Sequence, residues 1–152
     1  MASIAVSAPD SLRAVENLLG GQGVLRARPH STQDWINVIR RGIPAAAVEA
    51  LTKTIKVSHS ELARALGIPE RTLARRKREG ILSSEESAKL LRLARAVGRA
   101  NEVFEDPETA LHWLKSPNSA LSGATPLSVL DTEIGAESVL DTLGRIEHGV
   151  YA

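Results

Sequence analysis

The stretch SHSELARALGIPERTLARRKREG, residues 58–80, decides the fold of this chain. Its spacing predicts two short helices joined by a tight turn. Ala63 is small enough for the second helix to cross the first closely, and Gly67, four residues later, tolerates the positive φ that the turn needs. Leu73 then faces back into the angle between the helices, over a small core of Leu62, Leu66 and Ile68. This pattern predicts a helix-turn-helix.

The same positions are similar to the helix-turn-helix of phage-repressor-like proteins of the Cro and Xre type. One position departs from that pattern. Three residues after Leu73 such motifs usually carry another apolar residue, and here the residue is Arg76. We therefore expect the second helix to pack less deeply at this point, or to end differently.

The second predicted helix is strongly basic, with five cations among the eight residues 71–78 and no acid. In a major groove, its N-terminal residues would meet base edges and its flanking cations would meet phosphates. The residues predicted to contact bases are Arg71, Thr72 and Arg75. Those predicted to contact phosphates are Arg76, Lys77 and Arg78, with Ser58 or Ser60 at the start of the first helix. The alternative for any such charge run is a solvated helix face.

The rest of the chain also has helical periodicity, and we expect an all-α protein. Aromatic residues make up only 3% of the sequence, and a core of Leu, Val, Ile and Ala suits helix-on-helix packing. Caps and apolar spacing predict further helices over 11–20, 31–42, 45–55, 83–104, 107–114 and 132–147. Trp35 and Trp113 fall on apolar faces, which favours core positions for both.

Charge divides the chain into three regions. Residues 1–52 carry +1, residues 53–105 carry +5 from twelve cations and seven acids, and residues 106–152 carry −5 from two cations and seven acids. A basic middle suits phosphate, and an acidic end suits a different partner. We expect an N-terminal helical region over 1–52, a DNA-binding region over 53–104 and a small helical domain over 105–152.

The N-terminal region contains no motif, and its helices are too few for an independent core. Association with a second copy would cover their apolar faces. A homodimer would also place two helix-turn-helix units on a palindromic operator in double-stranded DNA. We therefore predict dimerisation through residues 1–52.

The C-terminal third, residues 103–152, carries a series of short motifs in order. They are Phe104 with Asp106-Pro107, Trp113-Leu114, Pro117-Asn118, Ala120-Leu121, Gly123, Thr125-Pro126-Leu127, Gly135-Ala136, Leu143-Gly144-Arg145-Ile146 and Gly149-Val150-Tyr151. Together they resemble the C-terminal domain of the MbcA/ParS/Xre antitoxins, and Ser122 departs from a second glycine common in that family. The resemblance implies a RES-domain toxin that degrades NAD⁺ as partner, an antitoxin C-terminus that occludes the toxin's active site, and repression of the antitoxin's own promoter.

The residues of this region fit such a role. Glu133, Glu137 and Asp141 recur every four residues, and Arg145 continues the line, so we predict an acidic stripe that contacts the toxin. The tail, formed by His148, Gly149, Val150, Tyr151 and Ala152, is compact enough to enter a cleft. A cleft built for NAD⁺ would offer cations to the acidic stripe. The alternatives are a solvated face and a frayed chain end.

Other classes of protein receive no support from the sequence. Cysteine is absent, no apolar run approaches the roughly 20 residues of a membrane helix, and the start of the chain lacks the pattern of a secretory signal. The four histidines lack metal spacing, and GGQG at 20–23 lacks the rest of a phosphate loop. We expect a cytoplasmic protein without catalytic residues, metal or cofactor. The alternative function is a stand-alone transcriptional regulator whose C-terminal domain senses a ligand.

Overall fold

The computed structural model describes residue 12 and residues 14–149, and this part of the chain is helical as expected. The elements of the N-terminal half are α2 (Val15–Leu18), α3 (Gln22–Leu25), α4 (Thr32–Arg41), α5 (Ala46–Ile55), α6 (His59–Leu66) and α7 (Glu70–Glu79). Those of the C-terminal half are α8 (Ser84–Phe104), α9 (Pro107–Leu114), the 3-10 turns η1 (Ser119–Leu121) and η2 (Pro126–Val129), and α10 (Glu133–Glu147). Within the described residues, the sole β pairing is one antiparallel bridge between Pro44 and Ile81.

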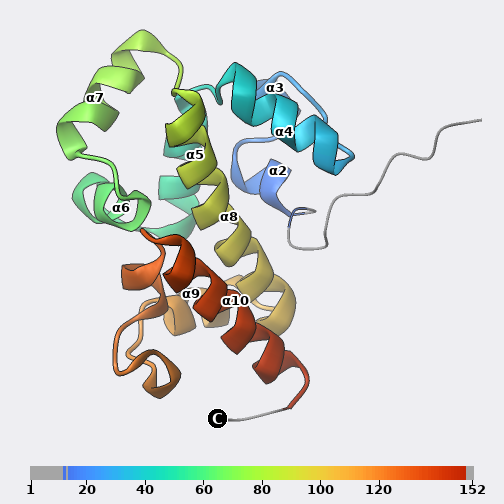
Figure 1. Cartoon of the computed structure of the whole chain (residues 1–152), viewed down its shortest axis with the longest axis vertical. Coiled ribbons are helices and arrows are strands. Elements are labelled where there is room, and N and C mark those ends of the chain that lie inside the picture. The colour runs from blue at the N-terminus through green and yellow to red at the C-terminus, as the bar shows by residue number, and fades with distance from the viewer. Residues whose placement is uncertain (1–11, 13, 150–152) are drawn as a thin grey trace, which may run out of the picture.

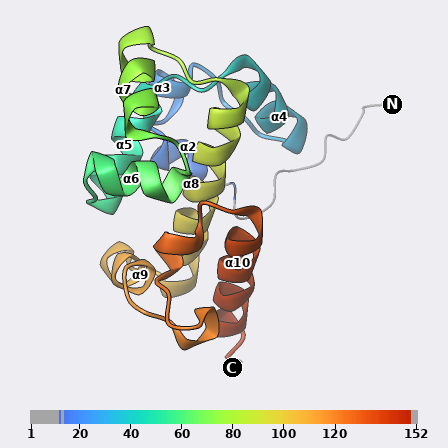
Figure 2. The ribbon, with the colours of Figure 1, turned by 60° about the vertical axis from the view of Figure 1, so that its left-hand side comes forward.

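Helix α8 is the axis of the molecule. Its 21 residues run through the whole structure, with α2, α4 and α5 around its first half and α9 and α10 around its second (Figures 1 and 2). The helix begins with a capping box, in which the Ser83 side chain accepts a bond from the Glu86 backbone and the Glu86 side chain bonds back to the Ser83 backbone. Leu90, Leu93 and Ala94 are fully buried on its apolar face, as the periodicity predicted.

The N-terminal helices share this core. Val15, Leu19, Leu25 and Trp35 are buried in the same hydrophobic cluster as the apolar face of α8. Their apolar faces are thus covered within one chain, and the burial argument for a second copy no longer holds. The helix expected to end at residue 20 ends earlier, at Leu18, and the chain then turns through two glycines with positive φ before α3.

The loops that follow α4 and α7 are held together. The backbone N–H of Leu82 donates to Ile43 (2.9 Å), and that of Ala45 donates to Gly80 (3.0 Å). Gly42 makes this close approach possible, since it has φ +97° and a Cβ placed there would lie 2.5 Å from the Leu82 carbonyl oxygen. The pairing fixes the C-terminal end of α7 against the body of the protein.

Hydroxyl and carboxylate caps start the helices that the sequence marked. Ser31 caps α4, Asp106 caps α9, and of the two candidates for α6 the cap is Ser58. Thr132, rather than Asp131, caps α10. Trp35 is buried as expected, whereas Trp113 is half-buried and packs on Phe104 with ring centroids 5.7 Å apart.

Candidate functional site

Helices α6 and α7 form the predicted helix-turn-helix. Gly67 ends α6 in the left-handed region with φ +71°, and Pro69 precedes α7. The apolar residues of the motif are buried between the two helices and the body of the protein: Leu62, Ala63, Leu66, Ile68 and Leu73. The motif therefore has the core that its sequence pattern required.

The outward face of α7 carries three arginines. Arg71, Arg75 and Arg78 are separated by four and three residues, a spacing that places them on one side of a helix. All three are exposed. Arg75 lies 3.5 Å from Glu79, while Arg71 and Arg78 have no ion-pair partner among residues 12 and 14–149. We name this set the arginine stripe; Lys77 is exposed as well, but it is paired with Glu49.

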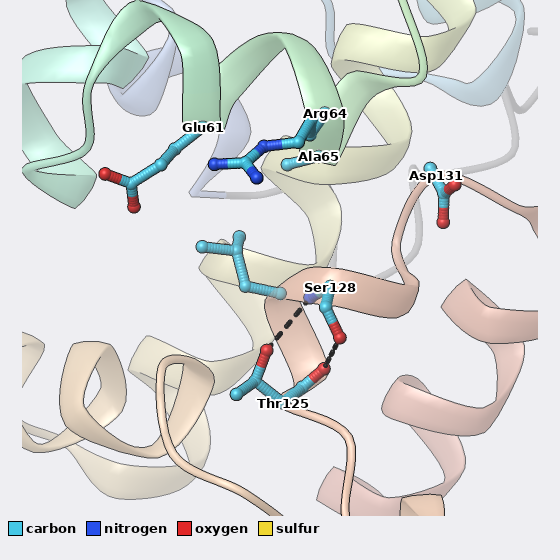
Figure 3. A pocket seen from close by; sticks show the side chains of 7 residues that line it. Glu61, Arg64, Ala65, Thr125, Ser128 and Asp131 are labelled. Carbon is cyan, nitrogen blue, oxygen red and sulfur yellow. Dashed lines mark hydrogen bonds between the residues drawn. The ribbon is translucent and has the colours of Figure 1, made fainter.

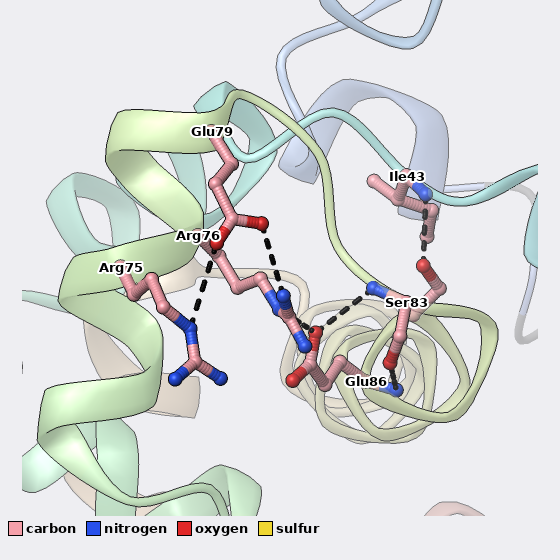
Figure 4. A network of polar contacts seen from close by, with 7 residues as sticks. Ile43, Arg75, Arg76, Glu79, Ser83 and Glu86 are labelled. Atoms are coloured by element: carbon pink, nitrogen blue, oxygen red, sulfur yellow. Dashed lines mark hydrogen bonds and ion pairs between the residues drawn. The ribbon is translucent and has the colours of Figure 1, made fainter.

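Arg76 points instead toward α8 (Figure 4). Its Nε donates to Oε1 of Glu86 (2.8 Å), and its Nη1 donates to Oε2 of Glu79 (3.0 Å). The side chain is 23% exposed. The position that is usually apolar is thus filled by a cation whose charge a carboxylate at the start of α8 neutralises.

Glu86 serves two purposes at once. Its Oε1 accepts from the backbone N–H of Ser83 (2.8 Å) as well as from Arg76, and the residue is only 8% exposed. Burial pushes the pKa of Glu86 up, but the bonds from Arg76 and Ser83 outweigh it and hold the pKa below its ordinary value. The capping box of α8 and the anchor of α7 therefore share one carboxylate.

Lys77 holds α7 on the side opposite to Arg76. Its ammonium forms an ion pair with Glu49 of α5, and the same Glu49 oxygen lies 3.1 Å from Nε2 of His59 on α6. The bond from Lys77 is the largest cause that lowers the pKa of Glu49. Helix α7 is thus fixed on one side to α8 and on the other to α5, with the arginine stripe between.

The remaining residues predicted to meet DNA lie at the edges of the motif. Ser58 Oγ accepts from the backbone N–H of Glu61 (3.1 Å) as the cap of α6, Ser60 is exposed on the first turn, and Thr72 is half-buried beside the arginine stripe. Sequence reasoning did not identify Glu49 and Glu86 as supports of α7. The signal for Glu86 was present, since it lies three residues after the Ser83 cap and the Arg76 departure required a buried partner.

Two arginines of α8 hold the C-terminal region in place. Arg92 donates to the carbonyl oxygens of Leu130 (3.0 Å) and Asp131 (2.8 Å), and its Nη1 lies 3.2 Å from Glu133. Arg99 donates to Glu147 (2.6 Å) at the other end of α10. The bond from Arg99 lowers the pKa of Glu147. Both ends of α10 are therefore fixed to α8.

These bonds divide the acidic stripe predicted on α10. Glu133 is engaged by Arg92, whereas Glu137, Asp141 and Arg145 are exposed. Within the described ranges, Asp141 and Arg145 do not pair with each other. His148 is exposed after the helix and Gly149 follows with φ +74°. The predicted tail residues Val150, Tyr151 and Ala152 lie outside the described residues.

The helix-turn-helix and the C-terminal region meet at a groove of about 450 Å³ (Figure 3). Glu61, Arg64 and Ala65 of α6 form one wall, and Thr125, Leu127, Ser128 and Asp131 form the other. At the same junction the ammonium of Lys89 donates to the carbonyl oxygen of Gly67 (3.2 Å), and a Cβ placed on Gly67 would lie 3.4 Å from the Asp131 carbonyl oxygen. The turn of the motif thus packs directly on the segment that precedes α10.

Residues 12 and 14–149 contain no group of three or more side chains able to hold a metal ion. The same residues include no helix that is both long and apolar enough to cross a membrane.

Comparison with known proteins covers both halves of the chain. Residues 34–95 match the family model of the antitoxin Xre-like helix-turn-helix domain, and residues 99–149 match that of the antitoxin Xre/MbcA/ParS C-terminal toxin-binding domain. The first match begins in α4, upstream of the boundary expected at residue 53.

Full-length relatives agree with these matches. The chain is 34% identical over 119 residues to the antitoxin Xre of Yersinia enterocolitica, covering 77% of this chain and 80% of the relative. It is 33% identical over 127 residues to the antitoxin Xre of Photorhabdus laumondii, covering 82% and 86%. It is 30% identical over 132 residues to the Prs ADP-ribosylating antitoxin of a Sphingobium species, covering 80% and 83%. The family resemblance read from the sequence is confirmed.

Proposed function

This chain belongs to the Xre family of antitoxins, and on that premise we propose that it neutralises a RES-domain toxin that degrades NAD⁺ and represses its own promoter. The C-terminal region occludes the toxin's active site, and the helix-turn-helix binds operator DNA. The protein acts by binding rather than by catalysis, without a cofactor, in the cytoplasm.

The arginine stripe is the observation that carries the DNA-binding half of this proposal. Lys77 and Arg76 fix α7 from both flanks, so Arg71, Arg75 and Arg78 are presented together on its outward face. A recognition helix that is already held in its orientation loses little helix freedom when it meets a groove. Arg71, Thr72 and Arg75 are proposed to contact bases, and Arg78 is proposed to contact phosphate.

The ion pairs that fix α7 also change the roles proposed for Arg76 and Lys77. Arg76 and Lys77 were expected at phosphates, but each is already paired with a carboxylate on another helix. Their proposed role is now to orient α7. Ser60, exposed on the first turn of α6, remains a proposed phosphate contact, while Ser58 contributes through the helix start that it caps.

The exposed acids of α10 support the toxin-binding half. Glu137 and Asp141 face solvent beside Arg145, on a helix whose two ends are fixed to α8. A toxin that binds the pyrophosphate of NAD⁺ offers cations near its cleft, and these acids complement that charge. Residues 148–152 follow α10 directly and are proposed to enter the cleft. A homodimer, which would match a palindromic operator, is part of the proposal as well.

Co-expression with a RES-type toxin encoded next to the antitoxin, if the genome carries one there, tests this function. The full chain is expected to restore growth and to co-purify with the toxin, and a chain lacking residues 149–152 is expected to fail to restore growth. A truncated chain that rescues growth fully would refute occlusion by the tail. A chain that binds its operator yet neither rescues growth nor co-purifies would act as a stand-alone regulator.

A further inference from the structure

Ile134, in the first turn of α10, is a large apolar side chain that the fold does not cover. It is 78% exposed, and Ile81, at 45%, is the other exposed large hydrophobic side chain in the described part of the chain. A single exposed isoleucine is common on protein surfaces. Ile134 differs from such residues in its position. It lies at the N-terminal end of the outward face of α10, within the region that matches the toxin-binding domain.

Helical spacing puts Ile134 in line with the exposed polar residues of α10. Steps of three, four, four and three residues lead from it through Glu137, Asp141 and Arg145 to His148. Such steps keep side chains on one side of a helix. Every residue of this line is exposed. Glu133 lies on the same side of the helix, four residues before Glu137, but its carboxylate is bonded to Arg92.

From this placement we propose that Ile134 is an apolar anchor for the toxin. The toxin surface that covers it is an apolar recess, and cations beside that recess pair with Glu137 and Asp141. The inference rests on the proposed function, since the occupant is the toxin that the C-terminal domain binds. It adds a contact distinct from the tail, one that supplies affinity rather than occlusion.

The length of α10 sets the spacing of the two contacts. Fourteen residues separate Ile134 from His148, which at 1.5 Å per residue is roughly 21 Å. The apolar recess on the toxin therefore lies roughly 20 Å from the mouth of the cleft that receives the tail. Both ends of α10 are held by arginines of α8, so this spacing is rigid.

The position of Ile134 also argues for the toxin rather than another occupant. The adjacent acids would repel a second copy of the same face and the phosphates of DNA. They complement the cations that a site for NAD⁺ requires. An apolar side chain next to exposed charges fits an interface in which an apolar contact is bordered by polar ones.

Calorimetric titration of the purified toxin with full-length variants tests the proposal. Ile134→Ala is expected to weaken toxin binding by about 10-fold or more, as loss of a buried isoleucine side chain implies. Ile134→Glu is expected to weaken it further. Ile81→Ala is the matched control, because it removes the other exposed isoleucine, and toxin affinity is expected to stay within about 2-fold of the parent chain.

Three readouts separate the possible outcomes. Equal affinity of the Ile134→Ala and parent chains for the toxin would overturn the anchor. A lower mass of free Ile134→Ala protein in light scattering, with unchanged toxin affinity, would assign Ile134 to self-association and also overturn it. If the parent chain did not bind the toxin, that result would overturn the proposed function itself, and the anchor proposal with it. The chain lacking residues 149–152 is expected to keep toxin binding through Ile134 while losing inhibition of NAD⁺ cleavage.

Discussion

Arg76 on α7 donates through Nε to a buried oxygen of Glu86 at the start of α8, over 2.8 Å. The same oxygen accepts the backbone N–H of Ser83. A basic residue of α7 is thereby turned toward α8, while its neighbours Arg75 and Arg78 remain exposed. The orientation of the arginine stripe therefore depends on this shared carboxylate.

Glu86→Gln is expected to lower the free energy of unfolding by about 1.5 kcal/mol. Glutamine keeps the shape and can still accept bonds from Ser83 and Arg76, so the loss reports the charge on a nearly buried bond. Glu85→Gln, on the exposed neighbour, is the control and is expected to change stability by less than about 0.5 kcal/mol. Urea denaturation of both variants at pH 7 measures the difference.

The stabilising effect of Glu86 is expected to depend on pH. Its pKa is lowered by folding from an ordinary value of 4.5, so its contribution is fully present above that pH and is lost as pH falls through the folded pKa. The parent chain and Glu86→Gln should therefore converge in stability as pH drops below about 4.5. A stability difference that stayed constant from pH 7 to pH 3 would contradict this role.

The double variant Arg71→Ala, Arg75→Ala is expected to lose operator binding by on the order of 100-fold while remaining folded, because both side chains face outward and each bidentate base contact is worth about 1–3 kcal/mol. A mobility-shift titration measures the loss, and circular dichroism checks the fold. Unchanged affinity would sink the assignment of α7 as recognition helix.

Arg78→Ala is expected to behave differently from that pair. As a phosphate contact, Arg78 should contribute similarly to all sequences, so its removal should weaken operator and non-specific DNA alike. The slope of log affinity against log salt should fall by about 1. A loss confined to the operator would instead place Arg78 at a base.

Gly42 and Gly80 provide a matched pair of glycines with positive φ, +97° and +92°. Gly80→Ala is expected to cost about 1 kcal/mol, since the strain is in the backbone alone and nothing lies within 4 Å of the added Cβ. Gly42→Ala is expected to cost at least about 3 kcal/mol, because the added Cβ would also meet the Leu82 carbonyl oxygen. Thermal denaturation of the two variants compares these costs; equal shifts would contradict the tight pairing of the loops.

Glu147→Gln is expected to loosen the last turn of α10, where Glu147 accepts two bonds from Arg99. Hydrogen exchange of the amides of residues 144–147 should become several-fold faster, with residues 135–140 unchanged, because opening is local to the weakened turn. Glu137→Gln, on the solvent face of the same helix, should leave both segments unaffected. Faster exchange along the whole of α10 would contradict a local opening, because it would mean that Arg92 alone does not hold the N-terminal end of α10.

The local features of the fold were readable from the sequence because each depends on neighbours in the chain. Ser31 and Ser83 cap helices whose first turns follow at once, and Gly67 and Leu73 mark the turn and the core of the motif. Periodicity also identified the long helix that became α8. The order of motifs after Phe104 indicated the antitoxin family.

The ion pairs that fix α7 could not be predicted from the sequence, because they join residues on different helices. Lys77 meets Glu49 across 28 positions of sequence, and nothing local distinguishes that lysine from the exposed Arg78. Residues 75–78 are a continuous basic run in sequence, yet packing pairs Arg76 and Lys77 with carboxylates of other helices and leaves Arg75 and Arg78 on the outward face. The N-terminal helices were likewise assigned to a dimer because their partner, α8, lies more than 40 residues beyond α4 in sequence.

Helix α8 passes without interruption from the region matched by the helix-turn-helix family to the region matched by the toxin-binding family. Each residue inserted into or removed from a continuous helix turns everything beyond it by about 100° and shifts it by about 1.5 Å. Recombination between antitoxins inside residues 95–99 must therefore conserve the rotational phase of α8. A hybrid that changes the helix by a single residue would rotate its C-terminal region by about 100° relative to its helix-turn-helix, and Gly67 would no longer pack on Asp131.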